Sequence, residues 1–418
     1  MTSTPLYDSA KPPMPSLRAL WHPAYLFLTA PVWVVLLYQI GRGAGNTGYL
    51  LFWLAACVLI LKRRDGVYPA SAALFFIALL LWGTLSAALS IDVQSALGKW
   101  WQYALLGSVF FITGWGVRRI PNFSLDHALR LVGIAGLLVF ALYAGRFLSL
   151  VGDPDFHPET QVHGLAAAYL APFALYFLRR HVPGRHGVGL MAAYLLSLFL
   201  LLNFSNSLTE VLALVAAVVV MLGFLTRNPR VLWLALASVV AALVALVMWV
   251  DQTGGILAQA SRDGSGWVEV LDRLSSQRTA LWRKALAIPP PNIWLGVGPG
   301  NVGQYPPVVV DLIGGGSIKV GHLHNFLLDC WYEIGVVGLA LYGLFYAAQL
   351  KLFWRGAQAL PLDQRAIAWA SLAAIAAAAM IEQSYRSYPV AMFVPFVLAL
   401  YGYGAYSFAL RPPSTAST

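Results

Sequence analysis

Apolar runs, many of them near 20 residues long, recur along the whole length of this chain. A run of about 20 apolar residues is long enough to cross the hydrocarbon core of a bilayer as a helix. Only 11% of the 418 residues are charged, against about 25% in a soluble domain, so the chain cannot cover itself with a water-compatible surface. The sequence therefore predicts an all-α, polytopic integral membrane protein.

Twelve apolar spans can be delimited, at residues 22–41, 48–61, 68–90, 100–117, 128–150, 163–178, 188–204, 208–225, 231–250, 325–349, 366–383 and 389–410. The longest polar connection follows the ninth of them. The chain is accordingly expected to consist of nine transmembrane helices (residues 1–250), a long loop (251–323), and three further helices with a short tail (324–418).

Lys and Arg cluster in the connections on one side of the membrane. They precede the first span and follow the even-numbered spans, as in Lys62-Arg63-Arg64 and Arg179-Arg180. Cation-rich connections remain in the cytoplasm, so both termini are predicted to be cytoplasmic. The net charge of +10 reflects this orientation, because no basic segment interleaved with aromatic residues is present to bind nucleic acid.

The long loop is the exception to this charge pattern, since it lies on the opposite, outer side and is nevertheless rich in cations. They are Arg262, Arg273, Arg278, Arg283, Lys284 and Lys319. Two interpretations are open: the loop binds something anionic, or it is an ordinary solvated loop that is translocated regardless of its charge.

Within the loop, residues 261–287 have the apolar spacing of an amphipathic helix. A rotation of about 100° per residue places Arg278 in the middle of its apolar stripe, which includes Leu281 and Trp282. A guanidinium in such a place needs a partner, because burying an unpaired charge is very costly. The partner is either a carboxylate of a facing helix or an anionic substrate such as a phosphate.

His322 and His324 lie where the loop enters the tenth span. At the first turn of that helix the positive end of the helix dipole disfavours an imidazolium, and a neutral imidazole is what a general base requires. The alternative is an interfacial histidine bonded to a loop carbonyl. Glu333, further down the same span, faces away from His324 and is expected to pack or form a hydrogen bond.

Several other polar groups are candidates on the outer side. Arg146 and Arg386 lie close to the apolar boundary and either face an anion or extend to lipid headgroups. Asp153, Asp155 and His157 form either a metal-binding triplet or, with Pro154, a simple turn. Residues 296–300 contain three glycines, but no strand precedes them and Pro299 removes an amide donor, which favours a turn over a phosphate-binding loop.

His324-Asn325, a nine-residue spacer and Gly335-Val-Val-Gly338 resemble the His-Asn/Ser/Gln to Gly-x-x-Gly signature of bacterial O-antigen ligases. Arg278 with Trp282, followed by Leu295-Gly-Val-Gly-Pro-Gly300, resembles the segment before this signature in the superfamily. The predicted topology is similar as well. One departure concerns the start of the eighth span, where many members carry Ser-Arg and this chain has Ser207-Leu208.

The resemblance implies transfer of a polysaccharide from undecaprenyl pyrophosphate to a sugar hydroxyl of lipid A–core, at the periplasmic face of a Gram-negative inner membrane. It implies an inverting reaction without metal or other cofactor, with His324 as general base and Arg278 stabilising the pyrophosphate. Arg146, Arg386, Asn325 and His322 are expected to contact substrate. Gly335 and Gly338 are expected to let the tenth helix approach a neighbour closely.

Three other functions remain open. An O-antigen polymerase would use the same donor, but such enzymes tend to have two sizeable outer loops, and the third outer loop here (151–162) is short. A protein O-oligosaccharyltransferase often extends beyond the last span, whereas the present sequence stops soon after Arg411. A lipid-linked glycan transporter would place charged or broken helices near the bilayer midplane, whereas the cations here gather at one face.

Overall fold

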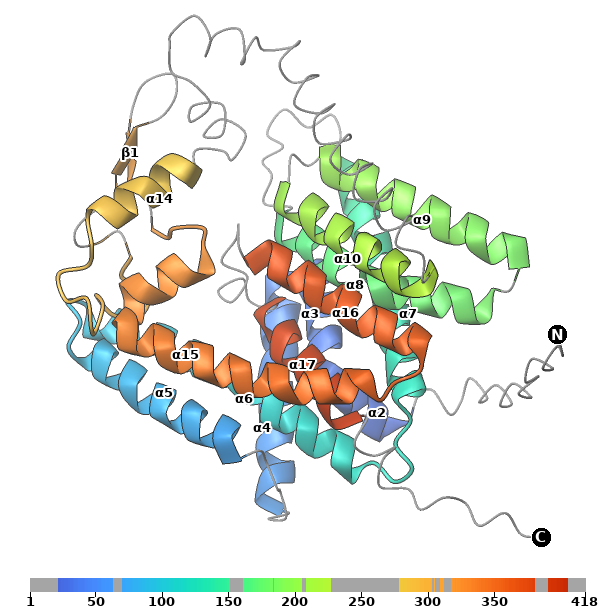
Figure 1. Cartoon of the computed structure of the whole chain (residues 1–418), viewed down its shortest axis with the longest axis horizontal. Coiled ribbons are helices and arrows are strands. Elements are labelled where there is room, and N and C mark those ends of the chain that lie inside the picture. The colour runs from blue at the N-terminus through green and yellow to red at the C-terminus, as the bar shows by residue number, and fades with distance from the viewer. Residues whose placement is uncertain are drawn as a thin grey trace, which may run out of the picture.

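The computed structural model describes residues 22–62, 70–150, 161–182, 184–204, 208–226, 278–302, 304, 309–311, 317–319, 321–379 and 390–404. It is a bundle of helices (Figure 1), which confirms the prediction of a helical membrane protein. The helices before the long loop are α2 (Pro23–Leu28), α3 (Ala30–Ile40), α4 (Arg42–Lys62), α5 (Ala70–Ala88), α6 (Val93–Arg119), α7 (Leu125–Leu150), α8 (Gln161–His181), α9 (Gly184–Phe204) and α10 (Leu208–Thr226).

The second part of the chain begins with α14 (Arg278–Ala287) and the short strands β1 (Val309–Asp311) and β2 (Ser317–Lys319). It continues with α15 (Phe326–Gln358), α16 (Leu362–Ala379), the 3₁₀ turn η1 (Val390–Met392) and α17 (Phe393–Gly404). Every predicted span coincides with one or more of these helices, except that at residues 231–250, which lies outside the described part of the chain. The predicted total of twelve therefore stays a prediction.

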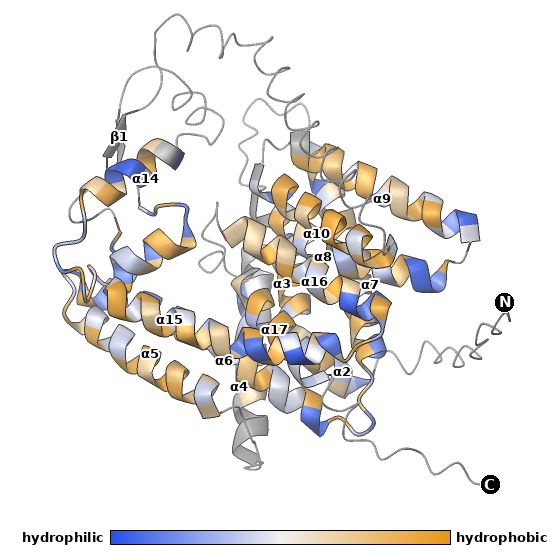
Figure 2. Ribbon diagram, viewed as in Figure 1, coloured by the Kyte–Doolittle hydropathy of each residue, from blue (hydrophilic) through white to orange (hydrophobic). Residues whose placement is uncertain are grey.

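Five of the described helices are long and apolar enough to cross a membrane. They are Ala70–Ala88, Leu125–Ser149, Gly184–Leu202, Thr209–Thr226 and Phe326–Gln358. Hydrophobic residues dominate the ribbons, and hydrophilic ones gather near helix ends (Figure 2). On α5 the exposed large side chains are Leu74, Ile77, Leu81 and Leu85, which recur at helical spacing and give this helix a lipid-facing stripe.

The structure departs from a purely helical chain in the long loop. β1 and β2 pair antiparallel, with Val310 opposite Ile318, and β1 contacts α14. Val and Ile, which supply three of these six strand residues, are residue types with a high propensity for strands. Helical periodicity in the neighbouring segment predicts the amphipathic helix but not this small hairpin.

Two packing arrangements involve α15 and α17, from the second part of the chain. α15 runs alongside α5 (Figure 1), and every residue of α17 is buried within the bundle, as expected for a helix that is apolar all round.

The first predicted span is divided at Thr29, whose hydroxyl donates to the carbonyl of Tyr25 at 2.8 Å.

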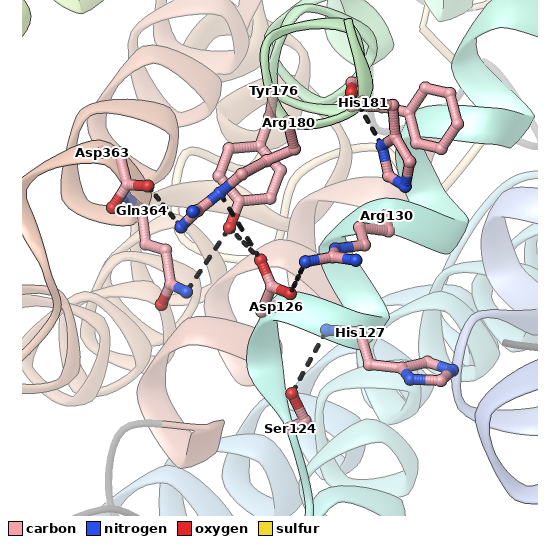
Figure 3. Close-up of polar contacts among 10 residues, drawn as sticks. Ser124, Asp126, His127, Arg130, Tyr176, Arg180, His181, Asp363 and Gln364 are labelled. Carbon is pink, nitrogen blue, oxygen red and sulfur yellow. Dashed lines mark hydrogen bonds and ion pairs between the residues drawn. The ribbon is translucent and has the colours of Figure 1, made fainter. Parts of the chain in front are cut away.

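A polar network joins α7, α8 and α16 at the end of the bundle where α8 finishes and α16 begins (Figure 3). Arg180 donates to Asp363 at 2.7 Å, and its Nε lies 3.8 Å from Asp126. Asp126 also pairs with Arg130 at 2.6 Å and accepts a short hydrogen bond from Tyr176. Charged groups from three helices thus neutralise one another, which fixes how the three helices meet.

Candidate active site

Helix α14 connects the beginnings of two membrane helices. Nη1 of Arg278 lies 3.3 Å from Oγ1 of Thr209, in the first turn of α10. One helical turn later, Nε1 of Trp282 donates to the carbonyl of Leu323 at 2.8 Å, just ahead of α15. Residues four apart lie on the same face of a helix. The same face of α14 therefore reaches both helix N-termini.

A small apolar cluster supports this same face of α14. Leu281 is 5% exposed and Ala285 is fully buried, and both pack with Leu323 and Tyr332. The hydroxyl of Tyr332 also donates to the carbonyl of Ala285 at 2.8 Å. The predicted apolar stripe is therefore real over the described part of this helix. Arg278 borders the stripe in a half-buried position, and one of its contacts is the hydroxyl of Thr209. Thr209 lies in the first turn of α10, next to Leu208.

His324 lies immediately before the N-cap of α15, two positions ahead of the first helical residue, so the prediction that it lies in the first turn is wrong. Its φ of 48° is left-handed, a conformation that histidine adopts more readily than most non-glycine residues. Asn325 is the N-cap, and its Oδ1 accepts from the amides of Leu327 at 3.0 Å and Leu328 at 3.1 Å. The left-handed residue turns the chain from the loop into the helix, so the position of the imidazole is set by a backbone turn.

The residue before His324 is held from both sides. The amide of Leu323 donates to Oδ1 of Asp329 at 2.8 Å, while its carbonyl accepts from Trp282. Asp329 is fully buried. Sequence reasoning missed Asp329, although a carboxylate in the first turn after an Asn cap is a recognisable signal. The rings of His322 and His324 lie 4.1 Å apart, so the structure brings the two histidines together.

Helix α15 is broken at Gly335, where φ is 70° and ψ is −176°. A break deprives the preceding carbonyls of their helical donors, and a buried carbonyl needs a replacement. The replacements come from outside the helix: the amide of Val297 donates to the carbonyl of Tyr332 at 2.8 Å, and that of Gly298 to the carbonyl of Glu333 at 2.9 Å. The indole of Trp82 on α5 donates to Ile334 at 2.9 Å.

The glycine-rich segment is thus part of the helix break, which agrees with the predicted turn rather than a phosphate-binding loop. A Cβ on Gly335 would lie 1.9 Å from the carbonyl oxygen of Trp294, so the two backbones touch. The amide of Gly300 donates to Oε1 of Glu333 at 2.7 Å. Glu333 therefore has the hydrogen-bonding role expected for it. Ser86 of α5 completes the junction by donating to the carbonyl of Leu295 at 2.7 Å.

The two motif glycines have different surroundings. Gly335 makes the close approach, but its partner is the loop at Trp294 and Leu295 and not a neighbouring membrane helix. The atoms nearest to a Cβ on Gly338 belong to Ile334 of the same helix. The prediction of a helix–helix approach at both positions is therefore corrected: the break at Gly335 lets a loop enter where the next turn of helix would be.

Arg146 lies near the C-terminal end of α7, one turn before its last, and its side chain is exposed. The neighbouring turn carries Tyr143, which lies with Gly164 and Glu210 at the same end of the bundle as Thr209. Arg146 is therefore at the same end of the bundle as Thr209 and Arg278. The predictions for Arg386, and for Asp153, Asp155 and His157, fall outside the described residues. Among the residues that are described, no three His, Cys, Asp or Glu side chains gather as a metal site would require.

Two comparisons with known proteins bear on the family to which this site is similar. A search of curated proteins found no match. The family model described as O-antigen ligase matches residues 191–343. This region contains Thr209, Arg278, His324, Gly335 and Gly338, the residues around which the site is built. Residues 191–343 are thus similar to O-antigen ligases, which confirms the resemblance predicted from the His324-to-Gly338 motif.

Proposed function

We propose that this protein is an O-antigen ligase that transfers a polysaccharide from undecaprenyl pyrophosphate to a sugar hydroxyl of lipid A–core. The observation that carries the proposal is the bridge made by α14. This helix connects Thr209 on α10 through Arg278 and the residue before His324 through Trp282. A cation and an imidazole are therefore held relative to each other by one rigid element.

The leaving group in this reaction is a pyrophosphate, which needs positive charge more than it needs a proton. A guanidinium can bind phosphate oxygens in pairs, and helix N-termini attract anions. Arg278 lies at the N-terminus of α10, and the N-terminus of α15 follows His324. These positive charges are already in place at the boundary between loop and membrane, where water is partly excluded. They can therefore stabilise the departing pyrophosphate without any rearrangement of protein groups during the reaction. This account uses no metal or other cofactor.

The acceptor hydroxyl is a poor nucleophile, and His324 is the proposed general base. The acceptor oxygen attacks the anomeric carbon as the bond from that carbon to the pyrophosphate oxygen breaks. The electron pair leaves with undecaprenyl pyrophosphate, and the hydroxyl proton passes to the imidazole. Attack opposite the leaving group inverts the anomeric centre. Asn325 and His322 flank the base, and Arg146 and Arg386 are further candidates for contact with the substrates.

Both substrates are lipids, so a site where a loop meets the membrane suits them. The charge pattern of the connections supports cytoplasmic termini, hence a site on the periplasmic face of a Gram-negative inner membrane. The surrounding helices expose apolar side chains to lipid, such as Leu81 at 69% and Leu327 at 48%. The lipid tails of donor and acceptor can therefore remain in the bilayer while the glycans meet above it.

The decisive experiment uses the purified protein with an undecaprenyl-pyrophosphate-linked glycan and three separate acceptors. Glycosylation of lipid A–core, with an inverted anomeric configuration in the product, supports the ligase. Elongation of a second lipid-linked glycan would identify a polymerase, and glycosylation of a pilin-type protein an oligosaccharyltransferase. Movement of the donor across sealed vesicles without any transfer would reject an enzyme altogether.

A further inference from the structure

A cavity lies at the end of the bundle where α8 and α10 finish and where α9 and α16 begin. Its volume is about 960 Å³, and it is formed by α8, α9, α10 and α16. The walls come from the last turns of α10 and α8, whereas Thr209 and Arg278 mark the first turn of α10. Its apolar lining consists mainly of Leu175, Met191, Leu195, Met221, Leu225 and Ile367. The cavity is thus separate from the candidate active site by most of the length of a membrane helix.

Two arginines border this apolar cavity. Arg179, in the last turn of α8, and Arg185, in the first turn of α9, both line it and both have exposed side chains. Within the part of the chain that the structure describes, neither makes an ion pair or a side-chain hydrogen bond. The acid that also lines the cavity, Asp363, is already paired with Arg180 at 2.7 Å (Figure 3). The mouth of the cavity therefore carries uncompensated positive charge.

A single arginine at a membrane boundary is explained by extension of its side chain toward the headgroups of whichever lipids surround it. Such extension does not explain why two of them flank the same apolar cavity. A volume near 960 Å³ falls within the range of small-molecule sites, about 300–1,000 Å³. Basic pockets between membrane helices are suited to anionic lipid headgroups, with the acyl chains along the apolar walls.

We infer that this cavity binds one anionic phospholipid. Its phosphate lies between Arg179 and Arg185, and an acyl chain lies along the apolar walls provided by α9 and α10. The lipid would cover the outer surface of α9 near Val188, which is 63% exposed. It would also connect α9 to α8 and α16, which the ion pair between Arg180 and Asp363 already joins. The site is independent of the glycan-transfer chemistry.

The test is a titration of the purified full-length protein with phosphatidylglycerol or phosphatidylcholine in detergent, with bound lipid counted by native mass spectrometry. Wild type is expected to retain phosphatidylglycerol in preference to phosphatidylcholine. The double variant Arg179→Gln/Arg185→Gln should bind phosphatidylglycerol roughly 30-fold more weakly, since each near-surface cation contributes about fivefold. The matched control is Lys351→Gln/Arg355→Gln, which removes two exposed cations from the end of α15, outside the cavity. It should bind like wild type.

A second variant tests the cavity itself without altering charge. Ala192 lines the cavity and is exposed, so Ala192→Trp should fill the space and lower phosphatidylglycerol binding while leaving the fold intact. Equal binding of the two lipids, or equal loss in the test and control double variants, would overturn the proposal. Displacement of the bound lipid by millimolar inorganic phosphate would also overturn it, because a free anion would then be the ligand.

Discussion

The indole N–H of Trp282 donates to the carbonyl of Leu323 at 2.8 Å, and the next residue along the chain is His324. A loop helix is thereby attached to the backbone turn that presents the imidazole. The amide of the same Leu323 is bound by the buried Asp329. Leu323, the residue before His324, is therefore held through both its amide and its carbonyl, and the direction of the imidazole depends on the position of α14.

Replacement of His324 by Ala is expected to reduce ligation of glycan to lipid A–core by about 100- to 10,000-fold, the usual contribution of a general base. The measurement is the rate of product formation by purified protein. The matched control is His186→Ala, which changes an exposed histidine at the start of α9, far along the bundle. Activity of His324→Ala near that of the control would remove His324 from catalysis.

Replacement of Arg278 by Ala is expected to lower the rate by about 100- to 1,000-fold, as does the loss of one preorganised group that stabilises charge in the transition state. Arg278→Lys should recover only part of this loss, because an ammonium cannot bind two phosphate oxygens as a planar fork does. Arg283→Ala, an exposed position on the same helix, is the control. Full recovery with lysine would mean that charge alone suffices.

Trp282→Phe keeps the ring but removes the donor to Leu323, and it therefore tests positioning. We expect kcat to fall by roughly tenfold or more, because small displacements of a reacting group are costly, while KM and the thermal unfolding temperature change little. Trp331→Phe alters a neighbouring ring of the same apolar cluster as a control. A change in unfolding temperature with kcat preserved would assign Trp282 to stability alone.

Gly335→Ala should destabilise the protein strongly. The left-handed conformation alone costs an alanine about 1–3 kcal/mol, and the methyl group would overlap the carbonyl oxygen of Trp294. Gly343→Ala lies on the same helix with nothing within 4 Å of the added carbon, so it should be tolerated. Thermal unfolding of both variants in detergent makes the comparison. Equal stability would show that the break in α15 does not depend on Gly335.

Chelation of divalent cations should leave ligation nearly unchanged, because the proposed chemistry relies on arginines and helix N-termini. The measurement is the ligation rate before and after treatment with EDTA. Strong inhibition that is reversed by adding one divalent ion would contradict this expectation, and would direct attention to Asp153, Asp155 and His157.

Much of the fold follows from the sequence through one physical constraint. In lipid, a backbone must satisfy its own hydrogen bonds, so apolar runs become helices and their positions can be read from hydropathy. The same reasoning located α15, and helical phase along it predicted that Glu333 would pack or form a hydrogen bond, as it does with the amide of Gly300. It failed at Gly335, where donors from elsewhere in the chain take over the carbonyls of the helix. Nothing in the local sequence specifies that Trp82, Ser86 and the amide of Val297 supply them.

Composition and apolar runs were enough to predict a helical membrane protein, and the spacing from His324 to Gly338 was enough to predict a resemblance to O-antigen ligases. These properties depend on composition and on short spacings, which are local. Three contacts could be known only from the folded chain: Arg278 meets Thr209, Trp282 and Asp329 hold the residue before His324, and the glycine segment enters the break in α15. These contacts join residues far apart in the chain, and they arise because buried polar groups must find partners wherever the packing supplies them.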